Sequence, residues 1–326
     1  MSALYPLKFT PILKDKIWGG NKLEDLLNKK IDPLPNAGES WEISGVEGDE
    51  SVVSNGFLKG NSINEVLEIY MGDLVGDRVF EKFGQEFPLL IKFIDANDVL
   101  SIQVHPDDEL AKERHSSFGK TEMWYVMQAD KGASLISGFN KQLDKKEYLE
   151  KLESNELDSI LASHEVEAGD VFYIPAGRVH AIGKGILLAE IQQTSDVTYR
   201  IYDFNRKDDH GNTRELHTEM AVDAIDYTYT PELKTDYPTT PNVSNEVVKC
   251  DFFKTNMLEL DTLIKKDFYG IDSFLIYMCV EGEADIKYGD GKVEPISKGE
   301  TVLIPADLRV IDIEPKGKVK LLEVHL

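Results

Sequence analysis

Short apolar runs, separated every few positions by glycine or proline, dominate the chain and predict a mainly β protein. The run 100–105 alternates apolar with polar side chains, as expected of a strand with one buried face. The other runs are β-rich but alternate less regularly. Strands are expected at 89–94, 100–105, 124–127, 171–174, 185–193, 197–202, 274–280, 301–304 and 318–324.

Helical periodicity is confined to two stretches, 63–70 and 141–162. In the second stretch, apolar residues recur three or four positions apart among charged residues, including Tyr148, Leu149 and Leu152. This spacing places them on one face of a helix, which favours an amphipathic helix packed against a β core.

A strand-turn-strand phrase occurs twice, at 169–180 and at 299–310, with Gly, an acid, Ile, Pro and Ala in register. A repeat of this kind indicates two related structural units. The first copy ends on His180 and the second on Val310. The strand that precedes the phrase also repeats, and this repeat aligns Glu122 with Asp272. The two copies of the strand lie farther apart in the sequence than the two copies of the phrase. The first unit is therefore expected to contain a helical insertion that the second lacks.

These patterns predict two β-barrel units, 1–235 and 246–326, with a few helices inserted in the first. The segment 230–245 is rich in Pro and Thr and is interpreted as the linker. The second unit has no set of metal-binding residues, and we expect it to support the first by covering a sheet edge and burying apolar faces.

The net charge of −23 argues against nucleic acid or an anionic membrane as a partner. A small anionic substrate is compatible with it, provided that a local pocket is cationic. The two cysteines form no spaced motif and are interpreted as buried thiols, which favours a reducing compartment. No apolar stretch approaches the roughly 18 residues of a membrane span. We therefore expect a cytoplasmic protein.

Four side chains form a candidate metal site in the first unit. Gln103 and His105 lie two positions apart and so share one face of a strand, Glu122 opens the next strand, and His180 follows a turn. Two imidazoles, a carboxylate and an amide oxygen suit a divalent first-row metal, zinc most readily. Two histidines with a carboxylate also fit a non-haem iron oxygenase.

The segment 169–180 resembles the second half of a cupin signature. The segments 17–20, 38–44, 103–106, 119–125 and 192–204 are similar to those of the type I mannose-6-phosphate isomerases, in their short bacterial form. This resemblance extends over nearly the whole chain. It implies two cupin-type jelly-roll barrels and an aldose-ketose isomerase acting on a small phosphorylated sugar.

By the same resemblance, Gln103, His105, Glu122 and His180 would hold one Zn²⁺. Arg200 would be the catalytic arginine, and Lys120 would act in proton transfer or in substrate binding. The longer members of the family carry His at the position of Gly119, so residue 119 cannot transfer a proton here.

The isomerisation of mannose 6-phosphate to fructose 6-phosphate moves a proton between C2 and C1 through a cis-enediol(ate). Glu190 shares a strand face with Leu188 and Gln192 and is one candidate for the base. The alternative for Glu190 is an ordinary strand carboxylate. Lys120 is the rival base, with substrate hydrogen bonding as its other role.

Ser101, Arg178 and Trp18 are candidate substrate-binding residues. Arg178 has solvated surface charge as its alternative role, and Trp18 has packing in a turn. Lys92, Arg200 and Arg206 are further candidates for binding the phosphate. Two other functions remain open: a cupin oxygenase, and a non-catalytic sugar-binding or regulatory cupin. A homodimer is also compatible with the chain.

Overall fold

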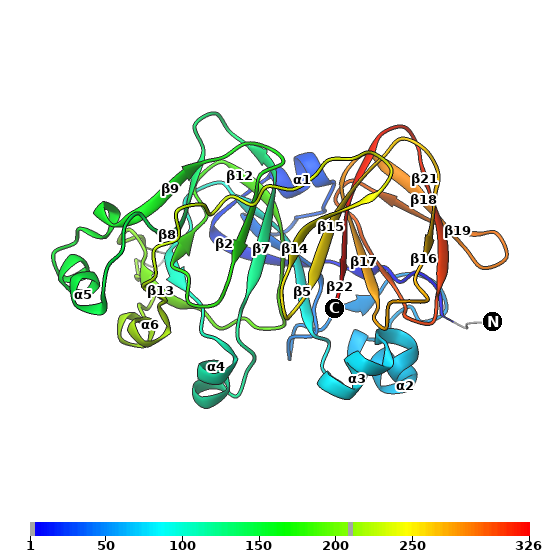
Figure 1. Ribbon diagram of the computed structural model, residues 1–326, viewed down its shortest axis with the longest axis horizontal. Helices are drawn as coiled ribbons and strands as arrows, with labels where there is room; N and C mark the ends of the chain where they lie inside the picture. Colours follow the sequence, from blue (N-terminus) through cyan, green and yellow to red (C-terminus); the bar gives the residue numbers. More distant parts are fainter. Residues whose placement is uncertain (1–3, 208–210) are drawn as a thin grey trace.

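Four β-sheets lie side by side along the long axis of the molecule, with short helices at the edges (Figure 1). The computed structural model describes residues 4–207 and 211–326. Two of these sheets are built from strands that precede residue 243, and we call them the N-terminal unit. The other two are built from strands after residue 243, and we call them the C-terminal unit. The described chain is mainly β, as the sequence predicts, with the cupin arrangement of paired antiparallel sheets.

The N-terminal unit consists of a six-stranded and a five-stranded sheet. In the order of pairing, the six strands are β10 (Val171–Ile174), β7 (Glu122–Ala129), β12 (Ile186–Gln193), β5 (Leu89–Ala96), β3 (Ala37–Ile43) and β2 (Ile12–Gly20). The five strands are β13 (Tyr199–Tyr202), β6 (Ile102–Val104), β11 (His180–Ala181), β8 (Ser134–Phe139) and β9 (Leu161–Glu165).

The C-terminal unit repeats this plan with fewer strands. One sheet contains β14 (Ser244–Lys249), β15 (Lys254–Leu260), β22 (Val319–His325), β17 (Leu275–Glu281) and β20 (Thr301–Ile304). The other contains β16 (Ile264–Asp267), β21 (Val310–Pro315), β18 (Glu283–Tyr288) and β19 (Lys292–Ser297). A separate two-stranded ribbon pairs β1 (Phe9–Thr10) with β4 (Val52–Val53).

The helices lie in the first 224 residues of the described chain. They are α1 (Lys22–Leu27), α2 (Ile63–Val75), α3 (Asp77–Phe83), α4 (Asp108–His115), α5 (Lys145–Glu153), the 3₁₀ turn η1 (Leu157–Ser159) and α6 (Thr218–Ala224). Ser62 and Glu65 form a capping box that starts α2. Asp107 and Asp144 accept backbone hydrogen bonds at the starts of α4 and α5. None of these helices has the length and apolar character that crossing a membrane requires.

The expected helix at 141–162 is shorter than predicted. It is helical at 145–153, passes through η1, and its last residues belong to β9. The helix does not extend to residue 162 because Leu161 is buried where β9 pairs with β8, and these last residues therefore form a strand. The insertion is nevertheless present in the N-terminal unit and absent from described residues 244–326, as expected.

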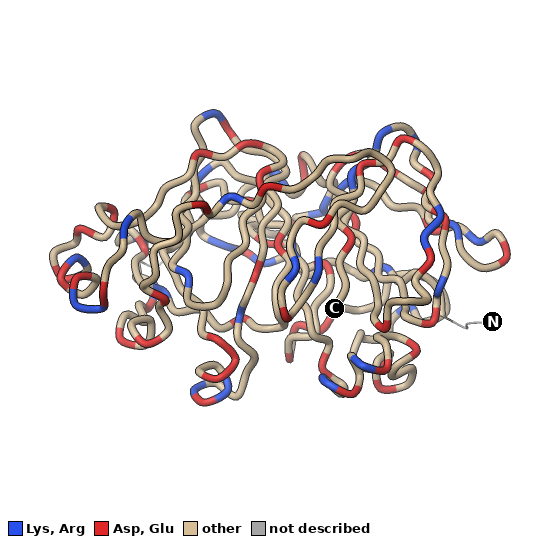
Figure 2. Tube along the Cα trace, in the orientation of Figure 1, with Lys and Arg blue, Asp and Glu red and all other residues tan. Residues whose placement is uncertain are grey.

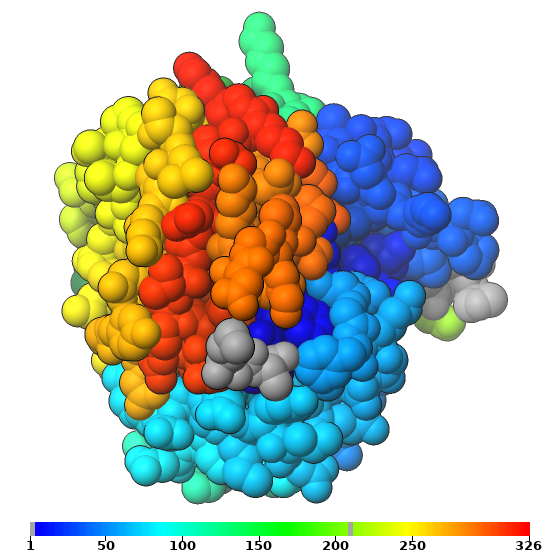
Figure 3. Space-filling model, turned by 90° about the vertical axis from the view of Figure 1, so that its right-hand side faces the viewer, coloured from blue at the N-terminus to red at the C-terminus, as the bar shows by residue number. Residues whose placement is uncertain are grey.

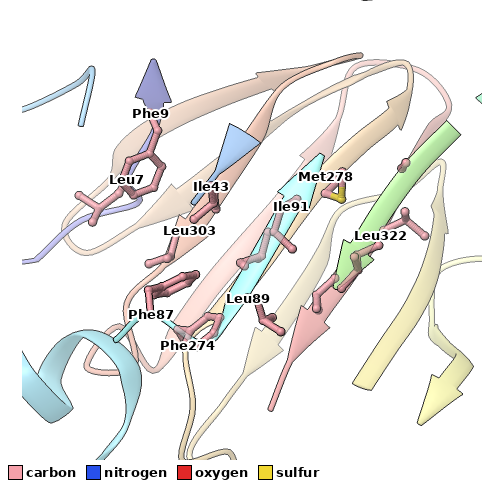
Figure 4. Close-up of a cluster of buried hydrophobic side chains, with 14 of the residues drawn as sticks. Leu7, Phe9, Ile43, Phe87, Leu89, Ile91, Phe274, Met278, Leu303 and Leu322 are labelled. Carbon is pink, nitrogen blue, oxygen red and sulfur yellow. The ribbon is translucent and has the colours of Figure 1, made fainter. Parts of the chain in front are cut away.

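The two units share an apolar layer (Figure 4). Leu89 and Ile91 of β5 face Met278 of β17 and Leu322 of β22 across it, and Phe87 packs on Phe274 with ring centroids 4.9 Å apart. The two units are also joined by backbone hydrogen bonds, because Leu7 and Leu303 donate to each other's carbonyls at 2.8 and 2.9 Å. Burial of this area is the main force that holds the units together.

The expected linker is irregular up to residue 243, apart from an isolated bridge between Lys234 and Phe172, and β14 begins at Ser244. The domain limits 1–235 and 246–326 themselves stay a prediction. Acidic positions are spread over both units (Figure 2), in keeping with the net charge of −23.

Candidate functional site

A row of paired residues crosses the five-stranded sheet of the N-terminal unit. Arg200 of β13 pairs with Gln103 of β6, and Gln103 pairs with His180 of β11. Directly paired residues of neighbouring strands project to the same face. Residues flanking Gln103 in β6, Ile102 and Val104, belong to the apolar cluster on the opposite face. The alternation that the sequence predicts for this strand therefore turns Gln103 inward.

His105, Glu122 and His180 converge in the interior of the N-terminal unit. Oε1 of Glu122 lies 3.5 Å from Nε2 of His105 and 3.3 Å from Nε2 of His180. The imidazole centroids are 4.7 Å apart. All three side chains are at most 1% exposed. In the described part of the chain, this is the one cluster of three His, Cys, Asp or Glu side chains with ligand atoms within 4.8 Å of one another.

Backbone carbonyls fix the orientation of both rings. Nδ1 of His105 lies 3.1 Å from the carbonyl of Val197, and Nδ1 of His180 lies 2.8 Å from the carbonyl of Arg178. Each contact calls for a proton on Nδ1, which leaves the Nε2 lone pair free and directed at Glu122. Burial lowers the pKa of His180 and lowers that of His105 well below its usual value. Both rings are therefore neutral, as metal ligands must be.

Three of the atoms that would bind a cation have no hydrogen bond within the described residues. Nε2 of His105 and both oxygens of Glu122 are buried without a hydrogen bond in the described structure. Buried polar atoms are rarely left unpaired, and those that are usually mark an ion, a water or a catalytic role. Two neutral imidazoles facing a carboxylate are a donor set that suits Zn²⁺ and neighbouring divalent ions. The residues present thus fit the metal that the sequence predicts.

Gln103 lies beside this cluster. Its amide nitrogen is 3.2 Å from Nε2 of His180, and its amide oxygen is 3.4 Å from the hydroxyl of Ser101. A half-turn of the carboxamide exchanges these two atoms, so the oxygen can face the cluster while the nitrogen donates to Ser101. Ser101 is 3% exposed. Its position indicates an orienting contact to Gln103.

A second row of polar residues lies on the interior face of the six-stranded sheet. Glu190 of β12 pairs with Trp124 of β7 on one side and with Lys92 of β5 on the other. The indole nitrogen of Trp124 donates to Glu190 at 2.8 Å, and the ammonium of Lys92 lies 3.1 Å from the other oxygen. Glu190 is 3% exposed, and its role as the base stays a prediction.

Glu39 extends this row toward solvent. Its carboxylate lies 3.2 Å from the ammonium of Lys16, 3.9 Å from that of Lys92, and accepts a hydrogen bond from Trp41. Burial would raise the pKa of Glu39, but Lys92, Lys16 and Trp41 together lower it to about 2. The contact between Glu39 and Lys92 was missed by the sequence reasoning, because it joins strands β3 and β5 that are far apart along the chain.

Lys120 lies next to the metal cluster, with its ammonium 3.8 Å from Oε2 of Glu122. Burial lowers its pKa, and the nearby ammonium of Lys92 acts in the same direction. The preceding residue is Gly119, where a Cβ atom would come within 2.5 Å of the backbone nitrogen of Asp108. The close approach of this loop to α4 explains in steric terms why no side chain is present at residue 119.

Three arginines gather at one end of the Gln103 row. Arg206 and Arg214 both donate to the buried carboxylate of Asp203, each at 2.5 Å. Arg200 donates to the carbonyl of Glu215 at 2.8 Å, and its Nε is buried without a partner in the described structure. Burial lowers the pKa of Arg200, and Arg214 acts in the same direction. Arg214 was missed at the sequence level because it lies outside the predicted strands.

Two predicted substrate residues lie in other surroundings. The guanidinium of Arg178 donates to the backbone carbonyl of Tyr173 at 2.8 Å, while its own carbonyl orients His180. Trp18 is 3% exposed and packs in an apolar cluster with Ile94 and Trp124. Contact of either side chain with a substrate stays a prediction.

The C-terminal unit carries no comparable cluster in its described residues. Strand pairing identifies the counterparts, because Ile174 pairs with Glu122 as Ile304 pairs with Leu275. The counterpart of Glu122 is therefore Leu275, and the sequence-level pairing with Asp272 is wrong by three residues. Asp272 instead accepts backbone hydrogen bonds from Asp77 and Arg78 at the start of α3.

The other counterparts follow from the same pairing. Gln103 pairs with His180 as Asp267 pairs with Val310, which makes Tyr269 the counterpart of His105. Tyr269 is exposed, and Val310 and Leu275 offer no ligand atom. That the second unit binds no metal stays a prediction.

Comparison with known proteins adds family identity to this geometry. Residues 6–155 match the family model of the phosphomannose isomerase type I catalytic domain, and residues 244–326 match that of the mannose-6-phosphate isomerase cupin domain. A mannose-6-phosphate isomerase of Bacillus subtilis is 37% identical over 98% of this chain and 99% of its own. One from Streptococcus mutans is 44% identical over 68% of this chain and 67% of its own.

Solved structures agree. The crystal structure of mannose 6-phosphate isomerase from Bacillus subtilis superposes with a TM-score of 0.87 at 33% identity, covering 98% of this chain and 99% of that one. A putative mannosephosphate isomerase from Archaeoglobus fulgidus shares the fold, with a TM-score of 0.77 at 22% identity over 99% and 98% of the two chains. From sequence, site and fold together, the chain belongs to the type I mannose-6-phosphate isomerase family of the cupin superfamily.

Proposed function

We propose that this protein interconverts mannose 6-phosphate and fructose 6-phosphate by proton transfer between C1 and C2. The observation that carries the proposal is the set of buried, unpartnered atoms on His105 and Glu122, beside a second imidazole held in the same tautomer. Unpaired polar atoms in a closed interior are costly, and a bound cation removes the cost. The family relatives, named as isomerases of this sugar phosphate, agree with the assignment.

His105, His180, Glu122 and the carboxamide of Gln103 would hold one divalent metal, for which we propose Zn²⁺. When bound, the metal would supply a Lewis acid that polarises the sugar carbonyl and lowers the energy of negative charge on oxygen. An oxygenase is not favoured, because the resemblance over the whole chain is to isomerases. A non-catalytic sugar-binding role is not favoured for the same reason.

The arginine cluster supports binding of a dianionic sugar phosphate. Arg200 offers one buried guanidinium nitrogen that has no partner among the described residues, and it lies in the same cross-strand row as Gln103 and His180. Arg206 and Arg214 add two positive charges, which face the carboxylate of Asp203 and, 3.9 Å from Arg206, that of Asp98, so that the three arginines outnumber these two carboxylates. This local excess of positive charge would offset the acidic protein as a whole.

Arg200 would then stabilise the enediolate that forms when the proton leaves C2 or C1, since a guanidinium stays charged throughout. Glu190 and Lys120 remain the two candidates for moving the proton. Glu190 has both oxygens in contact with donors, Trp124 and Lys92, which orient its carboxylate. Lys120 borders Glu122 at 3.8 Å and can equally hydrogen-bond a sugar hydroxyl.

A coupled assay with mannose 6-phosphate tests the function. A chelator should abolish turnover in the wild type, and added Zn²⁺ should restore it. His180→Ala should lose both metal content and turnover, whereas His164→Ala, on neighbouring β9, should lose neither. Turnover by chelated, metal-free protein would contradict the proposal.

Arg200→Ala separates the roles of metal and cation. We expect the variant to retain one metal per chain while kcat falls by about 10²-fold, the loss typical of removing one group that stabilises a developing oxyanion. An unchanged kcat would exclude Arg200 from the chemical step. A cytoplasmic location and a homodimer stay predictions from the sequence.

A further inference from the structure

A cavity of about 440 Å³ lies at the seam between the two units, away from the metal cluster. It is bordered on one side by β1, the start of β2 and the end of α1, and on the other by the turn between β19 and β20. The face shown in Figure 3 is where the orange strands of the C-terminal unit meet the blue N-terminal chain. Leu27 and Gly299 touch here so closely that a Cβ on Gly299 would come within 2.7 Å of Leu27.

Four lysines line this cavity: Lys8, Lys29, Lys30 and Lys298. Lys29 is neutralised by Glu42, 2.7 Å away, and both side chains are buried. Lys8 is neutralised by Glu300 at 3.0 Å, and Glu294 lies 3.6 Å from the same ammonium. Glu42 and Glu300 are the two carboxylates in the lining, so both are already used.

Lys30 and Lys298 therefore remain as uncompensated charges. Neither has an ion pair within residues 4–207 and 211–326, and the four lysines outnumber Glu42, Glu300 and Glu294, which leaves a net charge of about +1 at neutral pH. The protein as a whole has a net charge of −23, so a cationic cavity has a local potential opposite in sign to the rest of the surface. Such a cavity concentrates small anions.

Thr301 supplies an independent indication of a ligand. It lines the same cavity, is 6% exposed, and its hydroxyl has no hydrogen-bond partner in the described structure. Its neighbours Val302 and Ile304 lie in the C-terminal core, while Leu303 packs in the layer between the units. Thr301 shares the parity of Leu303, so its side chain projects toward the seam. A buried hydroxyl without a partner is costly unless a ligand completes it.

We propose that this seam cavity binds a small phosphorylated molecule, with Lys30 and Lys298 pairing with the phosphate and Thr301 donating a hydrogen bond to it. Ammonium groups bind phosphate as point charges, and a neutral hydroxyl adds direction. The cavity is large enough for a phosphate with a short organic group. Because its walls come from both units, a bound anion would join α1 to the β19–β20 turn and strengthen their contact.

Calorimetric titration of the full chain tests the site, with inorganic phosphate in one arm and glycerol 3-phosphate in the other. The wild type should bind one more anion per chain than Lys30→Ala/Lys298→Ala. Lys59→Ala/Lys131→Ala is the matched control, since it removes two exposed lysines and the same total charge outside the cavity. Equal stoichiometry in all three proteins would overturn the proposal. Tighter binding in one arm identifies whether free phosphate or an ester is the preferred ligand.

Thr301→Val tests the geometry independently of charge. Valine has nearly the same shape and no hydroxyl, so the variant should melt at the same temperature as the wild type or higher without ligand. It should nevertheless bind the anion about tenfold more weakly, the loss expected for one charge-assisted hydrogen bond. Unchanged affinity would show that the hydroxyl does not meet a ligand, and the site as described would be wrong.

Discussion

The two units share one scaffold but treat buried polar groups in opposite ways. In the N-terminal unit, Glu190 pairs across the sheet with Trp124 and Lys92, and in the C-terminal unit Glu323 pairs with Tyr277 and Asn256. Each central glutamate accepts a hydrogen bond from the aromatic residue beside it. The repeat thus preserves a buried carboxylate with an aromatic donor on the strand that corresponds to β12.

The difference lies next to that carboxylate, at Glu122, whose counterpart is Leu275. Glu323 has both oxygens satisfied, by Tyr277 at 2.6 Å, Lys266 at 2.8 Å, Ser244 at 2.8 Å and Asn256 at 3.0 Å. In the N-terminal unit the neighbouring Glu122 has neither oxygen hydrogen-bonded. A polar network in which every atom has a hydrogen-bond partner stabilises a core. Buried polar atoms without a partner usually mark a site for an ion, a water or a ligand. Glu323 thus belongs to a closed network, whereas Glu122 has oxygens that are open to a ligand.

Copying the residue of the C-terminal unit into the N-terminal one, as Glu122→Leu, should have the largest effect. Loss of the carboxylate should remove the metal, and turnover should fall by about 10³-fold or more, because metal-assisted polarisation supplies several kcal/mol. The melting temperature should not fall below that of metal-free wild type, since two unpaired buried oxygens disappear, but it should fall below that of the metal-loaded wild type, since bound metal stabilises the folded chain. Metal analysis, the coupled assay and thermal unfolding check these outcomes. Retained metal and turnover would mean that Glu122 is not a ligand.

Breaking the closed network, as Lys266→Ala, should cost stability and leave turnover unchanged. Removing the partner of a buried charge typically costs about 3 kcal/mol. Burial would raise the pKa of Glu323, but Lys266 and its hydrogen bonds outweigh burial and lower it. The stabilisation is therefore complete above the unfolded pKa and is lost as the pH falls through the lower folded pKa.

Urea unfolding at several pH values measures this difference. The gap between wild type and Lys266→Ala should be widest near neutral pH and should close in acid, once Glu323 is protonated. Lys265→Ala, an exposed neighbour, is the control and should change the free energy of unfolding by less than about 0.5 kcal/mol. A gap that does not depend on pH would contradict the role of the ion pair.

The smallest effect concerns the alignment of the two units. If Asp272 were the counterpart of Glu122, its removal would matter for a vestigial site. As a cap of α3, Asp272→Ala should lower the free energy of unfolding by about 1 kcal/mol, without changing metal content. Asp290→Ala, in an exposed turn, is the comparison. Equal stability of these two variants would argue against a capping role for Asp272.

Local pattern was sufficient to predict much of this molecule. Each of the nine expected strands is present, since apolar runs ended by Gly or Pro report directly on strands with a buried face. His105, Glu122 and His180 meet as expected. Each lies at the end of a strand, and these strand ends come together in the fold. Their identity as ligands stays a proposal.

Other features depend on packing that a single sequence does not display. The register of the repeat was misjudged because Asp272 resembles Glu122 in charge, whereas only strand pairing shows Leu275 in its place. Glu39 lies in the family-like segment 38–44 but had no role assigned to it, and Arg214 comes from a segment with no motif of its own; they reach the site through β3 and through the chain after β13. The strands β2 and β3, which precede β5, were not predicted from the sequence pattern.

The apolar layer between the units has a consequence for how the protein can be divided. Leu89 and Ile91 line its N-terminal side, Met278 and Leu322 its C-terminal side, and all four are fully buried. Expressed alone, either half would expose this apolar surface to water and would tend to aggregate. Each unit thus covers the apolar face of the other, and the N-terminal unit should be engineered only as part of the intact chain.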